Sequence, residues 1–212
     1  MRPLFALILF IAITSCRDLL VSQDATDVLT QDFLRGFPAL TDDSLVNVVV
    51  EIPAGTNEKW EVDKTDGSLQ WERITADSMR IIPYLPYPAN YGMVPRTLLP
   101  AEQGGDGDPL DVFLLGPTVE RGAVVVSRVV GVIQMRDHGE QDDKLIAVST
   151  AHWFGHVETL NQLQTDFPGV VEALTNWLAN YKGEGVVQIV AIADEEHARS
   201  VLLHAVNAFE AD

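Results

Sequence analysis

The segment Asp106-Gly107-Asp108-Pro109-Leu110-Asp111 places three carboxylates within six residues, directly after Gly104 and Gly105. Glycines allow a loop to fold tightly, so the carboxylate oxygens of such a loop can converge. Converging carboxylates repel one another unless cations neutralise them, and oxygen ligands are those that Mg²⁺ and Ca²⁺ prefer. The segment therefore predicts a divalent cation site, although by itself it is equally compatible with an acidic surface turn.

A second acidic cluster follows a long predicted strand, and its members are Asp137, Glu140, Asp142 and Asp143. Alone, this cluster is typical of an exposed hairpin tip. The chain has only four lysines, and three of them lie beside acidic or aromatic polar residues at the ends of predicted elements: Lys59, Lys144 and Lys182. Cations at such places in an acidic chain suggest a bound anion that is shared with metal ions.

The charge balance narrows the classes of partner. The 212-residue chain has 14 basic and 31 acidic residues, which gives a formal net charge of −17. This excess of negative charge argues against nucleic acid or an anionic lipid surface as the main partner. A chain of this length, with 47% hydrophobic residues, can bury the core of one domain. We therefore expect an acidic globular domain that handles any phosphate together with cations.

The elements that position these residues are mostly short strands. Alternating and β-branched apolar patterns predict strands at 45–52, 59–63, 69–73, 110–115, 123–133, 144–148 and 186–192. Helical spacing after Pro168 predicts a helix from Val170 to Tyr181, and a second helix is expected from Glu195 to Phe209. Short strands in quick succession favour a mainly β fold with a barrel, followed by two helices.

The N-terminus predicts export. An uncharged apolar run from Pro3 to Ile13 is too short for the ~20 residues of a membrane span and is typical of a signal peptide. It leads to Ile13-Thr14-Ser15-Cys16, which resembles the lipobox of bacterial lipoproteins, and Cys16 is the only cysteine. We expect a signal peptide at 1–15, a lipidated Cys16 with a tether over 16–43, and a domain over 44–212. A standard signal peptide, or an N-terminal helix with a buried thiol, is the alternative.

Taken together, the motifs resemble those of the family I soluble inorganic pyrophosphatases, from about Val48 to Lys182. The residues that carry the resemblance are Glu51-Ile52-Pro53-Ala54, Lys59-Trp60-Glu61, Arg73, Tyr87-Pro88-Ala89-Asn90-Tyr91-Gly92, the acidic segment 106–111, Val130-Gly131-Val132, Asp137, Asp142, Lys144 and Tyr181-Lys182. Each motif alone is weak, but the set is highly specific in this order and near this spacing.

The resemblance implies a five-stranded barrel of the oligonucleotide/oligosaccharide-binding (OB) type, flanked by two α-helices, and Mg²⁺-dependent hydrolysis of pyrophosphate to two orthophosphates by a metal-activated water. It implies metal ligands at Asp106, Asp111 and Asp142, with Glu51 and Asp137 binding the metal ions that arrive with the substrate. Asp108 would be the general base, and Tyr91 and Arg73 would complete the catalytic group. Contacts to phosphate would come from Lys59, Arg73, Lys144, Tyr181 and Lys182, with Glu61 supporting the site from its edge.

The same resemblance sets expectations for ions and assembly. Hard oxygen ligands should accept Mn²⁺ in place of Mg²⁺, whereas Ca²⁺ should bind yet inhibit because it is larger and acidifies its bound water less. Bacterial relatives are commonly hexamers, so we expect a homo-oligomer. The family is mostly cytoplasmic, but the lipobox predicts a membrane-anchored lipoprotein of the bacterial cell envelope, facing the periplasm or the exterior and touching the membrane through its lipid only; a cytoplasmic location is the alternative.

Three features depart from the short bacterial forms. Extra residues stand between Arg73 and Tyr87, His138 replaces a second acid after Asp137, and a lysine often found shortly after Lys182 is missing. A competing function is a catalytically weak phosphate- or Ca²⁺-binding lipoprotein on the same scaffold. Such a protein would be expected to lose Asp108, Arg73 or a lysine first, and all of them are present.

Overall fold

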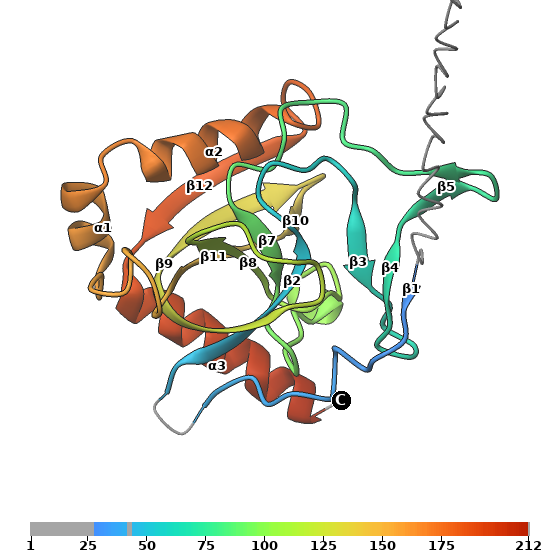
Figure 1. Ribbon diagram of the computed structural model, residues 1–212, viewed down its shortest axis with the longest axis horizontal. Helices are drawn as coiled ribbons and strands as arrows, with labels where there is room; N and C mark the ends of the chain where they lie inside the picture. The colour runs from blue at the N-terminus through green and yellow to red at the C-terminus, as the bar shows by residue number, and fades with distance from the viewer. Residues whose placement is uncertain (1–27, 42–43, 212) are drawn as a thin grey trace, which may run out of the picture.

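A barrel closed by five strands forms the body of the protein (Figure 1). The computed structural model describes residues 28–41 and 44–211. The ring runs through β2 (Val46–Ile52), β7 (Asn90–Met93), β8 (Asp111–Leu115), β11 (Lys144–Ser149) and β9 (Val124–Asp137), and β9 pairs again with β2. The mainly β fold and the five-stranded barrel that we expected are confirmed.

Strand β9 closes the ring because it is long enough to pair with several neighbours. Its 14 residues pair antiparallel with β11, with β2 and with β12 (Val187–Ala193). Close approach of β2 and β7 depends on Gly92, where a Cβ would lie 1.8 Å from the carbonyl oxygen of Val49. Any larger residue at position 92 would therefore push these two strands of the barrel apart.

Alternate residues of β2 contribute to two hydrophobic cores, because successive side chains of a strand point to opposite faces. Val49 belongs to the core that includes Trp177 of α2 (Val170–Asn180). Val48 and Val50 belong to the other core, which includes Leu202 of α3 (Glu195–Ala211). The strand is consequently buried along its whole length, which explains its nearly continuous apolar sequence.

A smaller sheet stands beside the barrel, on the right of Figure 1. It consists of β1 (Val28–Leu29), β4 (Leu69–Trp71) and β3 (Trp60–Val62), in that order. The chain continues from β4 into a separate hairpin of β5 (Arg73–Thr75) and β6 (Ser78–Met79), which projects from the molecule in Figure 1. The remaining short strand, β10 (Glu140–Gln141), pairs with the end of β9. The segment in which we expected extra residues thus begins with a hairpin outside the barrel.

Both predicted helices are confirmed, as α2 and α3, and each buries one apolar face against the barrel. The structure adds α1 (Leu160–Asp166), which begins where the Thr159 side chain accepts a hydrogen bond from the Gln162 amide, and a short 3-10 helix at Ala101–Gln103. The ring strand β7 was also not predicted, since its four residues include Gly92. Within the described residues, no helix has the length and apolar character needed to cross a bilayer.

The folded unit begins earlier than the boundary at 44 that the sequence suggested. In the segment 28–41, which we call the N-terminal arm, Phe33, Leu34 and Ala39 are buried, and β1 pairs with β4. The predicted tether therefore does not include the arm. Its scattered apolar residues gave no periodic signal because their partners lie far along the chain. The predicted signal peptide and Cys16 lie outside the described residues.

Candidate active site

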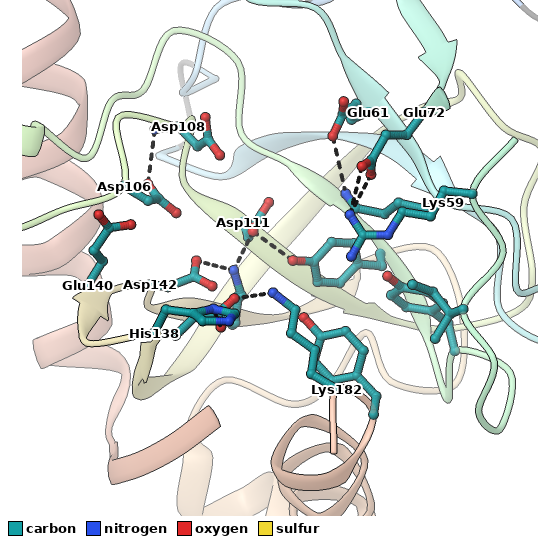
Figure 2. Close-up of a pocket in the computed structure, with 17 residues that line it drawn as sticks. Lys59, Glu61, Glu72, Asp106, Asp108, Asp111, His138, Glu140, Asp142 and Lys182 are labelled. Carbon is teal, nitrogen blue, oxygen red and sulfur yellow. Dashed lines mark hydrogen bonds and ion pairs between the residues drawn. The ribbon is translucent and has the colours of Figure 1, made fainter. Parts of the chain in front are cut away.

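A cavity of about 320 Å³ opens at one end of the barrel and holds most of the predicted site residues (Figure 2). Eight carboxyl groups and four permanently cationic side chains line it, which leaves a surplus of negative charge. The lining residues are Lys59, Glu61, Glu72, Arg80, Ile82, Tyr87, Tyr91, Asp106, Asp108, Asp111, Asp137, His138, Glu140, Asp142, Lys144, Tyr181 and Lys182. In Figure 2 the acidic-loop residues Asp106 and Asp108 lie across the cavity from Lys59 and Glu72.

Parallel pairing of β8 and β11 brings the two acidic clusters together. Asp111 begins β8 and Lys144 begins β11, and these two residues are paired in register. Parallel strands start at the same edge of a sheet, so the loops that precede β8 and β11 meet there. Asp142 comes two residues before Lys144, and Asp137 ends the neighbouring strand β9. The barrel thus collects residues that are more than 30 positions apart in the chain.

Lys144 lies at the centre of the cavity floor and is almost fully buried. Its ammonium group donates to Oδ2 of Asp111 and to Oδ1 of Asp142. Burial opposes the charge of Lys144, but the two carboxylates outweigh burial and hold the lysine pKa above its ordinary value. The hydroxyl of Tyr91 donates to the same Asp111 oxygen at 2.6 Å. These contacts fix the Asp111 carboxylate at the cavity floor.

The acidic loop is held mainly by its own backbone. The amide of Asp108 donates to Oδ1 of Asp106 at 2.9 Å, and two backbone hydrogen bonds of 2.8 Å join Gly107 and Asp108 to Leu99. Partial burial, together with the carboxylates of Asp142, Asp108 and Asp111, raises the pKa of Asp106 to about 7, although the hydrogen bond from the Asp108 amide opposes this rise. A cation bound near Asp106 would lower this pKa, because opposite charge favours the ionised form.

Cations also line the opposite wall. Lys182 donates to Oδ2 of Asp137, whose other oxygen lies 2.7 Å from Nδ1 of His138. The half-buried ammonium group of Lys59 lies 3.8 Å from the more exposed carboxylate of Glu61. Tyr181 also lines the cavity, directly before Lys182. The structure therefore brings together every predicted site residue of the cavity floor and of this wall.

Arg73 is a predicted site residue that the structure places outside the cavity. It begins β5, is exposed, and donates to the carbonyl of Ala76 at 3.0 Å within the hairpin. Arg80, which follows the hairpin, lines the cavity instead, where its guanidinium donates to both oxygens of Glu72 at 2.7 and 2.8 Å. The hairpin explains the difference, because it carries Arg73 outward and returns the chain at Arg80.

Glu51 lies in a second recess of about 360 Å³ that adjoins the cavity and shares Lys59, Asp108 and Asp111 with it. Its Oε1 accepts a hydrogen bond from the amide of Val62 at 2.8 Å. Burial raises the pKa of Glu51 to about 8, even though Lys59 favours the charged form. The predicted metal ligand Glu51 is therefore a neighbour of the cavity and not part of its lining.

The donor set suits a hard divalent cation. All the candidate ligands are carboxylates, their surplus charge calls for a cation, and a buried ammonium group already bridges two of them. As the side chains stand, no group of three metal-ligating residues in the described part of the chain is close enough to hold an ion. Lysine ammonium groups are bound to these carboxylates, so a metal ion would compete with them for Asp111, Asp142 and Asp137.

Two candidate functional residues were not predicted from the sequence, namely Arg80 and Lys64. Lys64 pairs with Asp108 from the neighbouring recess. It was the fourth lysine of a lysine-poor chain and stands close to the Lys59 motif, which was a usable signal. No sequence feature indicated Arg80. To predict that Arg80, and not Arg73, lies at the cavity, one must know that the hairpin projects away from the barrel.

Comparisons with known proteins agree on one family. The profile of a family described as inorganic pyrophosphatase matches residues 48–210. An inorganic pyrophosphatase of Xylella fastidiosa (strain 9a5c) is 36% identical over 173 residues, covering 78% of this chain and 89% of the relative. One from Campylobacter jejuni is 31% identical over 170 residues, covering 78% and 92%.

Solved structures are similar in the same way. The structure of an inorganic pyrophosphatase from Neisseria gonorrhoeae has a TM-score of 0.70 at 29% identity and covers 84% of this chain and 99% of its own. A type I inorganic pyrophosphatase from Toxoplasma gondii has a TM-score of 0.79 at 25% identity, with 85% and 88% covered. The similarity thus extends over nearly the whole described chain.

The raised pKa of Glu51 predicts a pH-dependent loss of stability. A carboxyl group with a raised pKa in the folded state favours folding when protonated, so this contribution is complete below about pH 4.5 and is lost as the pH rises towards about 8. Glu51→Gln keeps the shape and the acceptor but cannot ionise. In the presence of chelator, the unfolding free energy of the variant minus that of the wild type should increase by about 3 kcal/mol from pH 5 to pH 8. Denaturant titrations at both pH values measure this difference, and parallel pH profiles would contradict it.

Proposed function

The chain belongs to the inorganic pyrophosphatase family, and we propose how its cavity hydrolyses inorganic pyrophosphate to two orthophosphates. Pyrophosphate is a dense anion, so its hydrolysis needs neutralised phosphoryl oxygens, a deprotonated water and a stabilised leaving phosphate. The observation that carries the proposal is the meeting of the acidic loop with buried Lys144 in one cavity. Carboxylates that can bind cations and lysines that can bind phosphate therefore lie in the same cavity.

Different residues of the chain serve as general base, as cationic contacts to phosphate and as hydrogen-bond donors. Asp108, which is half exposed at the mouth between Asp106 and Asp111, accepts the proton of the attacking water as general base. Lys59, Lys144 and Lys182 hold phosphate oxygens as point charges, and their raised pKa values keep them cationic at neutral pH. The hydroxyl groups of Tyr91 and Tyr181 remain protonated because burial raises their pKa, so each can donate a hydrogen bond.

The family implies a divalent metal cofactor, and we infer that it is Mg²⁺. Asp106, Asp111 and Asp142 would hold the activating ions, and Asp137 the ions that arrive with pyrophosphate. Bound divalent cations supply charge neutralisation and lower the pKa of a coordinated water. Mn²⁺ can substitute because the ligands are carboxylate oxygens, and Ca²⁺ should compete without supporting turnover. Glu51 stays a predicted metal ligand on the side of the adjoining recess.

Arg80 takes over the phosphate-binding role that the sequence assigned to Arg73. Its planar guanidinium can bind a phosphate with two parallel hydrogen bonds. In the structure one of its nitrogens, Nη1, donates to both oxygens of Glu72. Glu61 lies beside Lys59 at the edge of the cavity, as a supporting residue should. The phosphate-binding wall then consists of Lys59, Arg80, Lys144, Tyr181 and Lys182.

The competing function, a catalytically weak phosphate- or Ca²⁺-binding lipoprotein, finds no support. Each side chain that such a protein would be expected to lose is present, and all but Arg73 lie at the site. The named relatives are inorganic pyrophosphatases as well.

The cellular location and the oligomeric state are proposed from the sequence. The lipobox at Cys16 supports a lipoprotein of the bacterial cell envelope. A homo-oligomer, with the hexamer as the expected form, finds support in Val190 and Ile192, which are exposed on β12. Sedimentation of the purified domain as a monomer would contradict the hexamer.

Phosphate release should depend on the metal ion. Purified residues 17–212 should release phosphate from pyrophosphate with Mg²⁺ or Mn²⁺, and chelator should abolish the release. Ca²⁺ added at fixed Mg²⁺ should inhibit competitively, because it occupies the carboxylates with longer and looser geometry. A phosphate assay over a Ca²⁺ titration measures this, and full activity with Ca²⁺ alone would show that the site is built differently.

The two arginines should differ in their effect on activity. Arg80→Met should lower kcat/KM by about 10² because it removes a charge-assisted contact to phosphate, worth up to about 3 kcal/mol. Arg73→Met is the matched control and should change kcat/KM less than about twofold, since Arg73 is exposed outside the cavity. Steady-state kinetics of both variants decide the assignment, and the reverse ranking would restore Arg73 to the site.

Cys16→Ala tests export. The substitution should leave pyrophosphatase activity unchanged and move the protein out of the membrane fraction, because the lipid would have no attachment point. Fractionation of cells that produce wild type and variant, with mass analysis of the N-terminus, measures the effect. Wild-type protein found in the cytosol with Met1 intact would refute export.

A further inference from the structure

All four lysines of the chain contact carboxylates of the site, and Lys64 is the one without a role in the proposed reaction. Its ammonium group donates to Oδ1 of Asp108 and, at 3.3 Å, to the carbonyl of Gly107. Lys64 lines only the adjoining recess, whereas Asp108 lines both the recess and the main cavity. The lysine therefore approaches the base from the side away from most of the phosphate-binding residues.

An ordered turn between β3 and β4 presents Lys64. The Asp63 carboxylate accepts hydrogen bonds from the Thr65 amide and from the Gln70 side chain, both at 2.7 Å. Two backbone hydrogen bonds of 2.8 Å link Asp63 with Gly67 and Ser68 across the turn. Gly67 has φ of 74°, a conformation that glycine adopts without strain. Although the Lys64 side chain is 58% exposed, its backbone is fixed.

The N-terminal arm braces this turn from outside. The amide of Phe33 donates to the carbonyl of Gly67 at 2.8 Å, and a guanidinium nitrogen of Arg35 lies 3.4 Å from the carbonyl of Lys64. Phe33 is itself buried in the core shared with the barrel. The turn is consequently held on both sides, by the small sheet and by the arm.

Within residues 28–41 and 44–211, Lys64 is the one side chain that hydrogen-bonds the Asp108 carboxylate. The remaining contacts of Asp108 go through its backbone, to Asp106 and Leu99. They place the Cα of Asp108 but leave the rotation of its carboxylate free. A general base must point at the water it deprotonates, and small errors in position are costly.

We propose that Lys64 is a positioning residue that orients the carboxylate of Asp108 for proton transfer. Lys64 holds one carboxylate oxygen, Oδ1, so the other oxygen can face the cavity. This role rests on the proposed function of Asp108 as general base. It differs from phosphate binding, which would require Lys64 to reach the substrate itself.

Kinetics of Lys64→Met and Lys64→Arg, each in the wild-type and in the Asp108→Asn background, test the proposal. Lys64→Met should lower kcat about tenfold and change KM less than about twofold, because the base is misplaced while substrate contacts persist. Lys64→Arg should recover most of the loss, since it keeps a cationic donor at this position. Asp108→Asn alone should lower kcat by about 10², and adding Lys64→Met to it should cause no further fall.

Two further measurements separate positioning from general effects. Arg199→Met removes an exposed cation from α3, outside the cavity, and should leave kcat unchanged. Calorimetric titration with Mg²⁺ in the absence of substrate should give a Kd for Lys64→Met within about twofold of the wild type, because Asp106, Asp111 and Asp142 keep their own contacts. The melting temperature of each variant checks the fold.

Several results would overturn the proposal. One is an unchanged kcat in Lys64→Met, and another is a Lys64→Met variant in which only KM rises. A third is a fall in kcat, on adding Lys64→Met, that is equally large in the wild-type and in the Asp108→Asn background. An unchanged kcat in Asp108→Asn would remove the base role and this proposal with it. A wild-type protein that released no phosphate would instead refute the proposed function itself, so the two failures are distinguishable.

Discussion

A buried ammonium group between carboxylates is the interaction on which the site depends. Lys144 is 3% exposed, and without Asp111 and Asp142 beside it the burial of its charge would cost several kcal/mol. The same carboxylates repel one another without a cation. Their mutual dependence requires that β8 and β11 start side by side, and the in-register pairing of Asp111 with Lys144 meets that requirement. The closed barrel therefore holds Lys144 beside Asp111, in addition to burying the hydrophobic core.

Aromatic rings couple this charged floor to the hydrophobic core. Tyr91 packs edge-on against Phe113 of β8 with 5.0 Å between ring centroids, while its hydroxyl holds Asp111. Trp177 of α2 lies 4.4 Å from Tyr87 and stacks on Tyr181 at 4.5 Å. The helix thus supports the cavity wall that ends in Lys182. Rings of this kind place polar groups rigidly, because their apolar bodies are packed while their hydroxyl groups stay in reach of the site.

Two peripheral segments shape the site from outside the barrel. The β5–β6 hairpin carries Arg73 away from the cavity and returns the chain at Arg80, which lines the cavity. The N-terminal arm contacts the turn that presents Lys64, through Phe33 and Arg35. The arm is therefore in contact with the support of the proposed base.

The sequence by itself determined the chemistry and the kind of fold. Carboxylates clustered within short segments, and the order of the motifs around them, predicted the acidic cation site, the lysines and the barrel, because these features depend on residue type and local spacing. Helices α2 and α3 followed from their apolar periodicity. Strand β7 and the place of the N-terminal arm depended on pairing with distant segments, which leaves no periodic trace. Three features were decided by tertiary structure alone, since each depends on where a turn or hairpin points in space. They are the position of Arg80 at the cavity and of Arg73 outside it, the recess around Glu51 and the contact of Lys64 with Asp108.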